Sequence, residues 1–495
     1  MSSLKEFLMM SEAAGDLDQY IIAAQEPFED GLRTLVEIPS VSQHAVCKPD
    51  VRRCILSAEE YLQILMKGGT KVDTKSRLIG WDNGLPAVYW KCIRHRKWPT
   101  IILYNHLDVQ PAEQKDGWDT EPFELVILDA PKVGRQYFGR GTTDDKGPAL
   151  VGLLAIKFAL LRGLPLNFVV VWESEEEDGS MHFPEILAQI KDDLQGLSSP
   201  SLLISDTIWP AVHVPSVSCG LRGVINFTFE LTTAIDDRNR AKGVHSGLCG
   251  GVATNPIIRL SHVIAASVDE AGWVAVRGAH DGLAPLPAEA LEAFAQTDAI
   301  TLETFKRDFG LRSCFAGSVP DLLNRIWNLP TFEVTGIIGG VTEPAGAVKT
   351  EIPGYARAHV SCRLGPGQDP VQFEQALRKH VARIDSDMVI IRRGGVSRPF
   401  AMDPKGPYLQ AAAEAFKTGF GYPEVVFDRC GGSIGAVIHF TELLPGLPVV
   451  LLGLSLPTHN YHGTNENFDW RQAAGGIRTF VHYFERVANM PTAQK

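Results

Sequence analysis

Several short apolar runs in the first half of the chain share one pattern. They cover residues 100–105, 167–173 and 201–206, are rich in β-branched residues and do not alternate with polar positions. Continuous runs of this length are typical of parallel strands that are covered on both faces. Between the first two runs, residues 148–161 are predicted to form a helix with Pro148 in its first turn. Strand, helix and strand in this order predict βαβ units and an α/β fold.

The pattern changes after about residue 219. Apolar and polar residues alternate over residues 224–231 and 355–364, as in antiparallel strands with one exposed face. Residues 370–384 have the periodicity of an amphipathic helix. After about residue 397 the buried pattern returns, with candidate strands at 425–427 and 449–452. We therefore predict an α/β domain with a mainly parallel sheet, formed by residues 1–218 and 397–495, which is interrupted by an inserted α+β domain over residues 219–396.

The composition narrows the class of protein. The chain has 495 residues and a formal net charge of −11, which argues against nucleic acid or an anionic membrane as the main partner. Its apolar runs are shorter than the ~20 residues that span a bilayer, and acidic residues interrupt the N-terminal segment where a signal peptide is apolar. The eight cysteines include no C-x-x-C pair, so a cysteine-built zinc site or a dense disulfide framework is not expected. We expect a reduced cytoplasmic protein.

Side chains that can bind metal ions follow the apolar runs. In open parallel sheets, ligands bind outside the carboxyl ends of the strands. Four successive strand ends that each supply a carboxylate or an imidazole therefore predict one common site. These residues are His106 and Asp108 after the first run, Asp144 and Asp145 after a strand-like segment at 138–143, Glu175, Glu176 and Glu177 after the second run, and Asp206 at the end of the third.

Such a cluster of carboxylates requires positive charge, because the groups otherwise repel one another and take up protons. A pair of divalent metal ions bridged by one carboxylate would supply it. Imidazole and carboxylate ligands without a thiolate favour Zn²⁺, with Mn²⁺ or Co²⁺ as alternatives. The spacing of His106 and Asp108 allows the carboxylate to orient the ring nitrogen that does not bind metal. Two metals bridged by water generate hydroxide near neutral pH, and one member of the Glu176–Glu177 pair is placed to carry the proton.

Sequence stretches spread from residue 105 to residue 466 resemble a known family. These stretches, in the family's order, are NHLDVQPAEQKDGWDTEPFEL, FGRGTTDDKGP, EEEDGS, ISDTIW, GLRG, VHSGLCGG, KTEIP, GGSIG and HGTNE. With them the chain is similar to the carnosinase and cytosolic nonspecific dipeptidase branch of the di-zinc metallopeptidases, whose wider members include aminoacylases and glutamate carboxypeptidases. The resemblance implies a zinc-peptidase-like catalytic domain, an inserted lid or dimerisation domain, and a homodimer.

The resemblance also implies which residues hold the two zinc ions and which peptide bond is cis. Asp144 would bridge the metals, and the bond between Asp144 and Asp145 is expected to be cis. His459 is an alternative to His462 as the last ligand, but the Asn-Glu pair at 465–466 favours His462. The implied ligand sets are His106, Asp144 and Asp206 for one zinc, and Asp144, Glu177 and His462 for the other.

The remaining roles are likewise implied by the resemblance. Asp108 would orient His106, Glu176 would be the general base, and His245 would stabilise the oxyanion, often across a dimer interface. Arg393 stands where several relatives carry His, and it places a permanent, bidentate cation there. The expected substrate contacts are Thr350, Arg363 and Arg393 from the inserted domain, and Gly432 and Ser433 from the main domain.

Two other classes, a serine hydrolase and a binding protein without catalysis, fit the sequence less well. Gly431, Ser433 and Gly435 form a G-x-S-x-G motif, as in the nucleophile elbow of serine hydrolases. However, Glu442 is the only acid between Ser433 and His459, and too little chain follows the serine to complete that fold. A binding protein that had lost catalysis would lack the bridging carboxylate, the base or the terminal His, and all of them are present.

We therefore predict a metal-dependent hydrolase that cleaves the peptide bond of dipeptides through a metal-bridging hydroxide, with Glu176 as general base. An N-acyl amino acid amidohydrolase or a carboxypeptidase-like enzyme remains the alternative, because these enzymes share the metal ligands and differ in the pocket. The expected substrate is accordingly a small peptide or an N-acyl amino acid.

Overall fold

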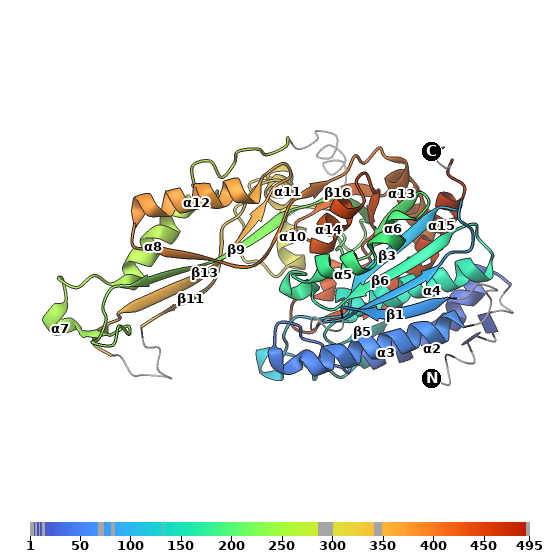
Figure 1. The fold of residues 1–495 in the computed structure, drawn as a ribbon, viewed down its shortest axis with the longest axis horizontal. Coiled ribbons are helices and arrows are strands. Elements are labelled where there is room, and N and C mark those ends of the chain that lie inside the picture. Colours follow the sequence, from blue (N-terminus) through green and yellow to red (C-terminus); the bar gives the residue numbers. More distant parts are fainter. Residues whose placement is uncertain are drawn as a thin grey trace.

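The chain folds into a larger α/β lobe and a smaller, elongated lobe, as Figure 1 shows for the computed structural model. The larger lobe contains both ends of the chain, and the smaller lobe is built from its middle. The structure describes residues 4, 7–8, 10–11, 15–67, 74–80, 85–131, 133–285, 300–340 and 349–491.

The larger lobe is organised around a mixed sheet with a parallel centre. Strands β6, β3, β7 and β17 pair in parallel, whereas β1, β2 and β15 add antiparallel pairs toward the edges. The predictions of parallel strands at 100–105, 167–173 and 201–206 are confirmed. The strands in sheet order are β1 (Lys75–Ile79), β2 (Ala87–Cys92), β6 (Asn167–Glu173), β3 (Thr100–His106), β7 (Pro200–Ile204), β17 (Val449–Leu451), β8 (Ser216–Leu221) and β15 (Phe400–Ala401), with β16 (Val426–Cys430) paired to β8.

Helices cover both faces of this sheet, which explains why its central strands do not alternate in sequence. Phe168 and Val170 of β6 pack into one core cluster, and Val169 and Val171 pack into the cluster on the opposite face. On the first face lie α2 (Leu17–Val36), α3 (Lys48–Met66), α4 (Gly147–Leu161), α13 (Pro407–Phe420) and α15 (Trp470–Ala488), and on the second lie α5 (Phe183–Gln189), α6 (Lys191–Gln195) and α14 (Gly435–Leu443).

The smaller lobe contains an antiparallel sheet in the order β11 (Glu333–Gly339), β13 (Tyr355–Leu364), β9 (Gly223–Thr232) and β14 (Val389–Ser397). Alternate residues of β9 and β13 are buried, as their sequences predicted. The buried positions pack against α8 (Pro256–Ser267) and α12 (Pro370–Ile384), and the helix predicted over 370–384 is confirmed.

Short elements complete both lobes. At the end of the smaller lobe that lies farthest from the larger one, α7 (Ser246–Cys249) follows β10 (Val244–His245), which pairs with β12 (Glu351–Ile352). Between residues 300 and 328 lie α10 (Leu302–Asp308) and α11 (Val319–Trp327). In the larger lobe, β4 (Val126–Ala130), β5 (Gly134–Phe138) and β18 (Asn467–Asp469) form a small antiparallel sheet.

None of the helices in the described ranges is long and apolar enough to cross a membrane.

The domain boundaries expected at 218/219 and 396/397 each fall inside a strand. The first lies within β8 of the central sheet and the second within β14 of the smaller sheet. A division after Leu221 and after Ser397 keeps both sheets whole. The inserted domain stays a prediction. The sheet of the smaller lobe comes from its range, whereas Leu323 and Trp327 of the same range pack in one cluster with Val426 of the larger lobe.

Candidate metal centre and substrate cavity

The first group of potential metal ligands lies at the carboxyl ends of two neighbouring parallel strands. His106 is the last residue of β3, and Asp206 follows β7. Nε2 of His106 lies 3.0 Å from Oδ1 of Asp144 and 3.8 Å from Oδ2 of Asp206. All three side chains are buried, and each offers a ligand atom within 4.8 Å of the others. The geometry therefore brings the predicted ligands of the first metal together.

Asp144 reaches this group by a route that differs from the predicted one. The sequence pattern predicted that it follows a strand of the central sheet, but that prediction is wrong, because β5 belongs to the small separate sheet. Gly139 and Gly141 have φ angles of 152° and 88°, so the chain bends after Phe138 and cannot continue as a strand. Asp144 then lies in the tight turn that precedes α4, and its peptide bond to Asp145 is cis, as expected.

The second group of potential ligands surrounds the other oxygen of Asp144. Nε2 of His462 lies 2.8 Å from Oδ2 of Asp144 and 3.3 Å from Oε2 of Glu177. The three side chains again offer ligand atoms within 4.8 Å of one another. Each group thus faces a different oxygen of Asp144, which is the arrangement that a bridging carboxylate requires.

The residues present fit a pair of divalent cations. Oδ2 of Asp144 is buried and accepts no hydrogen bond from the described residues, although Nε2 of His462 is close to it. Such an oxygen is costly to bury unless a cation or a donor compensates it. The donor set of imidazole and carboxylate without thiolate suits zinc and similar borderline divalent metals.

Burial and mutual repulsion characterise the carboxylates around both groups. Burial raises the pKa of Glu176 well above its ordinary value, and the negative charges of Asp206 and Glu177 add to this shift against the opposing charge of His106. Burial likewise raises the pKa of Glu177, and Asp144 contributes in the same direction. Carboxylates in this state retain their charge only when cations lie among them.

Asp108 connects His106 to the loop that carries the glutamates. Its carboxylate accepts the backbone N–H groups of Glu176 and Glu177 at 3.1 and 3.0 Å, and the hydroxyl of Ser42 at 2.6 Å. Nδ1 of His106 lies 3.0 Å from the backbone carbonyl oxygen of Asp108 and 3.5 Å from its carboxylate. Asp108 therefore contacts the imidazole mainly through its carbonyl, while its carboxylate holds the start of the glutamate loop.

Glu466 fixes the turn that carries Asp144. Its buried carboxylate accepts the backbone N–H groups of Gly141, Thr143 and Asp144 at 2.9, 3.0 and 3.1 Å. Arg140 donates to the same carboxylate at 2.9 Å. Glu466 lies four residues after His462, so it links the two segments that supply ligands to the second group.

The competing imidazole, His459, lies outside both groups. It is buried, and its Nε2 lies 3.0 Å from Oδ2 of Asp469. Its other ring nitrogen is 3.2 Å from the hydroxyl of Thr143. These contacts hold His459 within the fold and away from both ligand groups, whereas His462 is the imidazole that approaches Asp144 and Glu177.

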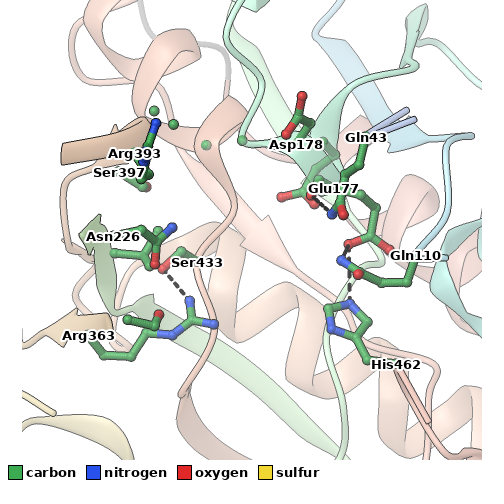
Figure 2. A pocket seen from close by; sticks show the side chains of 17 residues that line it. Gln43, Gln110, Glu177, Asp178, Asn226, Arg363, Arg393, Ser397, Ser433 and His462 are labelled. Carbon is green, nitrogen blue, oxygen red and sulfur yellow. Dashed lines mark hydrogen bonds and ion pairs between the residues drawn. The ribbon is translucent and has the colours of Figure 1, made fainter. Parts of the chain in front are cut away.

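A cavity of about 500 Å³ lies beside the second group, between the two lobes. Figure 2 shows Glu177, Gln110 and His462 on one side of it, and Arg363 and Ser433 on the other. The polar and charged side chains of the larger lobe that line it are Gln43, Gln110, Glu176, Glu177, Asp178, Ser433 and His462, and those of the smaller lobe are Asn226, Ser361, Arg363, Arg393 and Ser397.

Comparison with known proteins identifies the family. Residues 102–486 match peptidase family M20/M25/M40. The chain belongs to this family. It is 28% identical to Beta-Ala-His dipeptidase of Rattus norvegicus, over 97% of this chain and 96% of that protein. It is 30% identical to Cys-Gly metallodipeptidase DUG1 of Saccharomyces cerevisiae, over 79% and 80% of the two chains. The resemblance drawn from the sequence stretches is thereby confirmed.

A solved structure of the same family supports the predicted fold. The structure of human carnosine dipeptidase 1 matches with a TM-score of 0.82 and 26% identity, and the match covers 98% of this chain and 99% of that one. The α/β fold with a mainly parallel central sheet and an additional lobe is therefore that of an M20 dipeptidase.

The predicted substrate contacts of this M20 family member divide into two sets. Arg363, Arg393 and Ser433 line the cavity. Nη1 of Arg363 donates to Oγ of Ser433 at 2.9 Å, and Nε of Arg393 donates to the hydroxyl of Thr228 at 3.0 Å. Gly432 does not line this cavity, but lines a second, smaller and mainly apolar one.

His245 and Thr350 form the second set, and the structure does not bring them to the metal groups. Both are exposed at the far end of the smaller lobe, beside α7, and neither lines the cavity (Figure 1). They are neighbours there, because the carbonyl oxygen of Thr350 accepts the backbone N–H of Ser246 at 3.0 Å and its hydroxyl at 2.9 Å.

Several residues at the site were not predicted from the sequence. Gln110 donates to Oε2 of Glu177 at 2.6 Å, and Gln43 donates to the backbone oxygen of the same residue at 2.7 Å. The hydroxyl of Tyr461 donates to Asp206. Gln110 lies two residues after Asp108 in the stretch NHLDVQ, so its place in the sequence already indicated that it is near the site. Nothing in the sequence pattern indicated Gln43 or Tyr461.

Proposed function

We propose that this protein is a metal-dependent dipeptidase. The observation that carries the proposal is the cavity between the lobes, which has Glu177 and His462 of the second ligand group on one side and Arg363 on the other. No carboxylate in the described part of the chain forms an ion pair with Arg363, so its charge is available to a substrate. The names of the similar M20 proteins, Beta-Ala-His dipeptidase and Cys-Gly metallodipeptidase, support a dipeptide as substrate.

His106, Asp144 and Asp206 would hold one metal ion, and Asp144, Glu177 and His462 would hold the other. The donor set favours zinc over manganese or cobalt as the native metal. When bound, the metal pair lowers the pKa of water and polarises the scissile carbonyl.

Glu176 is proposed to carry the proton during hydrolysis. Its side chain lines the cavity, and its backbone N–H is held by Asp108 at 3.1 Å. In this position its carboxylate takes a proton from the attacking water and then passes it to the leaving amine. A positioned acid–base residue of this kind is typically worth about 10²–10⁴-fold in rate.

Arg363 is proposed to bind the terminal carboxylate of the substrate, with Ser433 beside it. A guanidinium forms strong, paired hydrogen bonds to a carboxylate. Ser433 orients this guanidinium, because its Oγ accepts from Nη1 at 2.9 Å while its hydroxyl donates to the backbone oxygen of Arg222. Arg393 would add charge from β14, more weakly because its side chain is about half exposed and already bound to Thr228. A cavity of about 500 Å³ suits a small peptide rather than a folded protein chain.

We further propose that the enzyme is a homodimer in which the partner subunit's His245 and Thr350 complete the site. Apolar side chains at the end of the smaller lobe are exposed, including Leu248 at 83% and Val252 at 88%. The edge strand β11 also exposes Ile337 and Ile338. Exposed apolar surface beside an unpaired strand edge is typical of a protein–protein contact. A second copy that covers this lobe could bring His245 to the oxyanion of its neighbour.

A panel of substrates tests this proposal. The purified protein is stripped with a chelator, reconstituted with zinc, manganese or cobalt, and assayed on unblocked dipeptides and on N-acetyl amino acids. We expect hydrolysis of unblocked dipeptides only after metal is restored. Preferential cleavage of N-acetyl amino acids would favour the amidohydrolase alternative, and full activity of the stripped protein would refute the proposed function.

A further inference from the structure

Tyr461 contacts both groups of potential metal ligands. Its ring stacks on the imidazole of His462, with a centroid distance of 5.2 Å and an interplanar angle of 27°. Its hydroxyl donates a hydrogen bond to Oδ1 of Asp206. One side chain therefore touches a ligand of the first group through its hydroxyl and a ligand of the second group through its ring.

The hydrogen bond divides the two oxygens of Asp206 between different partners. Oδ1 accepts the Tyr461 hydroxyl, whereas Oδ2 lies 3.8 Å from Nε2 of His106, on the side of the first group. A carboxylate that is held in this way presents only its other oxygen to a cation. Hydrogen bonds to metal ligands orient them and typically change metal affinity by about 10–100-fold.

The backbone around Tyr461 keeps its side chain directed at the site. Asn460 and His462 have φ angles of 54° and 59°, in the left-handed region that few non-glycine residues adopt. The N–H of Gly463 donates to the carbonyl oxygen of Asn460 at 2.8 Å, and Arg140 donates to the carbonyl oxygen of His462 at 3.4 Å. These contacts hold the loop in a conformation in which Tyr461 and His462 both reach the ligand groups.

We propose that Tyr461 is a positioning residue for the metal pair, a role that rests on the proposed metal-dependent function. Its hydroxyl holds Oδ1 of Asp206, and Oδ2 would remain for the first metal. Its ring fixes the orientation of the His462 imidazole for the second metal. Loss of the hydroxyl alone should therefore weaken one site, and loss of the whole ring should weaken both.

The experiment is stepwise zinc binding to the metal-free full-length protein, measured by calorimetry with zinc alone. Tyr461→Phe removes the hydroxyl and keeps the ring, and Tyr461→Ala removes both. Asp206→Asn and Glu177→Gln serve as references that identify the binding steps of the first and second sites. Tyr422→Phe is the matched control, because it removes a hydroxyl whose contacts, His213 and Arg471, belong to neither ligand group.

We expect Tyr461→Phe to weaken by about 10–100-fold the same step that Asp206→Asn weakens, with the other step unchanged. Tyr461→Ala should weaken both steps, and Tyr422→Phe neither. If both zinc-binding steps of Tyr461→Phe have the wild-type affinity, the inference is overturned and the proposed function stands. The same holds if Tyr461→Phe weakens the binding step that Glu177→Gln weakens. A wild-type protein that binds fewer than two zinc ions would remove the proposed function and the inference together. If Tyr461→Ala fails to fold, the conservative Tyr461→Phe decides.

Discussion

The two lobes contribute to the proposed active site in different ways. In the larger lobe, two ligand groups, the first of them buried, converge within one chain, and Asp108 and Glu466 hold the segments that carry them. In the smaller lobe, Arg363 faces the cavity, but His245 and Thr350 are exposed at the opposite end. Contacts within one chain bring the ligand groups together, whereas His245 and Thr350 lie outside both ligand groups and outside the cavity of their own chain. Under the proposed function, a single chain supplies all ligands of the metal centre, and stabilisation of the oxyanion would depend on a second chain.

The largest effect is expected from the residue that bridges the two ligand groups. Asp144→Ala should abolish the binding of both metals and all measurable turnover, because each group loses an oxygen ligand. Elemental analysis of the purified variant measures the metal content directly. Asp237→Ala, an exposed aspartate of the smaller lobe, is the control and should keep both metals. A full pair of metals in Asp144→Ala would contradict the bridging role.

The next effect separates proton transfer from metal binding within the larger lobe. Glu176→Gln should keep both metals and reduce kcat by about 10²–10⁴-fold, because the amide cannot accept the proton of the attacking water. Steady-state kinetics and elemental analysis on the same preparation measure the two quantities. Glu424→Gln changes an exposed glutamate in the same way and should have wild-type kcat. Near-normal turnover of Glu176→Gln would exclude this residue as the base.

A variant at the far end of the smaller lobe tests whether this lobe takes part in catalysis. His245→Ala should reduce kcat by about 10²–10³-fold, as expected for loss of one donor to the oxyanion. It should leave the metal content unchanged, because His245 lies outside both ligand groups. Wild-type kcat in this variant would show that the far end of the smaller lobe takes no part in catalysis.

Co-expression of His245→Ala with Glu176→Gln tests whether the missing group comes from a second copy. In a mixed dimer, one of the two sites combines an intact Glu176 with the partner subunit's intact His245. Random pairing should therefore restore about a quarter of the wild-type activity. Light scattering establishes the dimer in the same samples. Mixed dimers without recovered activity would contradict the contribution in trans.

The smallest expected effects concern the two arginines of the cavity. Arg363→Ala should reduce kcat/KM by about 10–100-fold, mainly through KM, because a buried charge-assisted contact to the carboxylate is lost. Arg393→Ala should reduce it less, by under about 10-fold, since that side chain is about half exposed. Kinetics on one unblocked dipeptide compares them. The reverse order would assign the carboxylate to Arg393.

The sequence predicted the larger lobe better than the smaller one for physical reasons. Continuous apolar runs identify strands that are buried on both faces, so β3, β6 and β7 and the residues after them were predictable. The path of the chain to Asp144 was not predictable, because Gly139 and Gly141 change its direction after β5. The spacing of apolar residues, which repeats every two residues in strands and every 3.6 in helices, carries no information about such a turn.

Long-range placement was the other limit of the sequence. The amphipathic pattern predicted α12, β9 and β13, but no local pattern states how far His245 lies from the metal ligands. Gln43 and Tyr461 approach the site only through tertiary contacts, and their neighbours in sequence carry no spacing signal. Membership in a family supplied the roles of matched residues, and the structure is needed to show which of them meet within one chain.

Metal titration tests the central claim most directly. The chelator-stripped protein is supplied with increasing zinc, and hydrolysis of an unblocked dipeptide is recorded against bound metal per chain. The account predicts negligible activity without metal, a rise that is complete at two ions per chain, and no further gain beyond this ratio. Full activity in the stripped protein, or saturation at one ion per chain, would contradict a dinuclear dipeptidase.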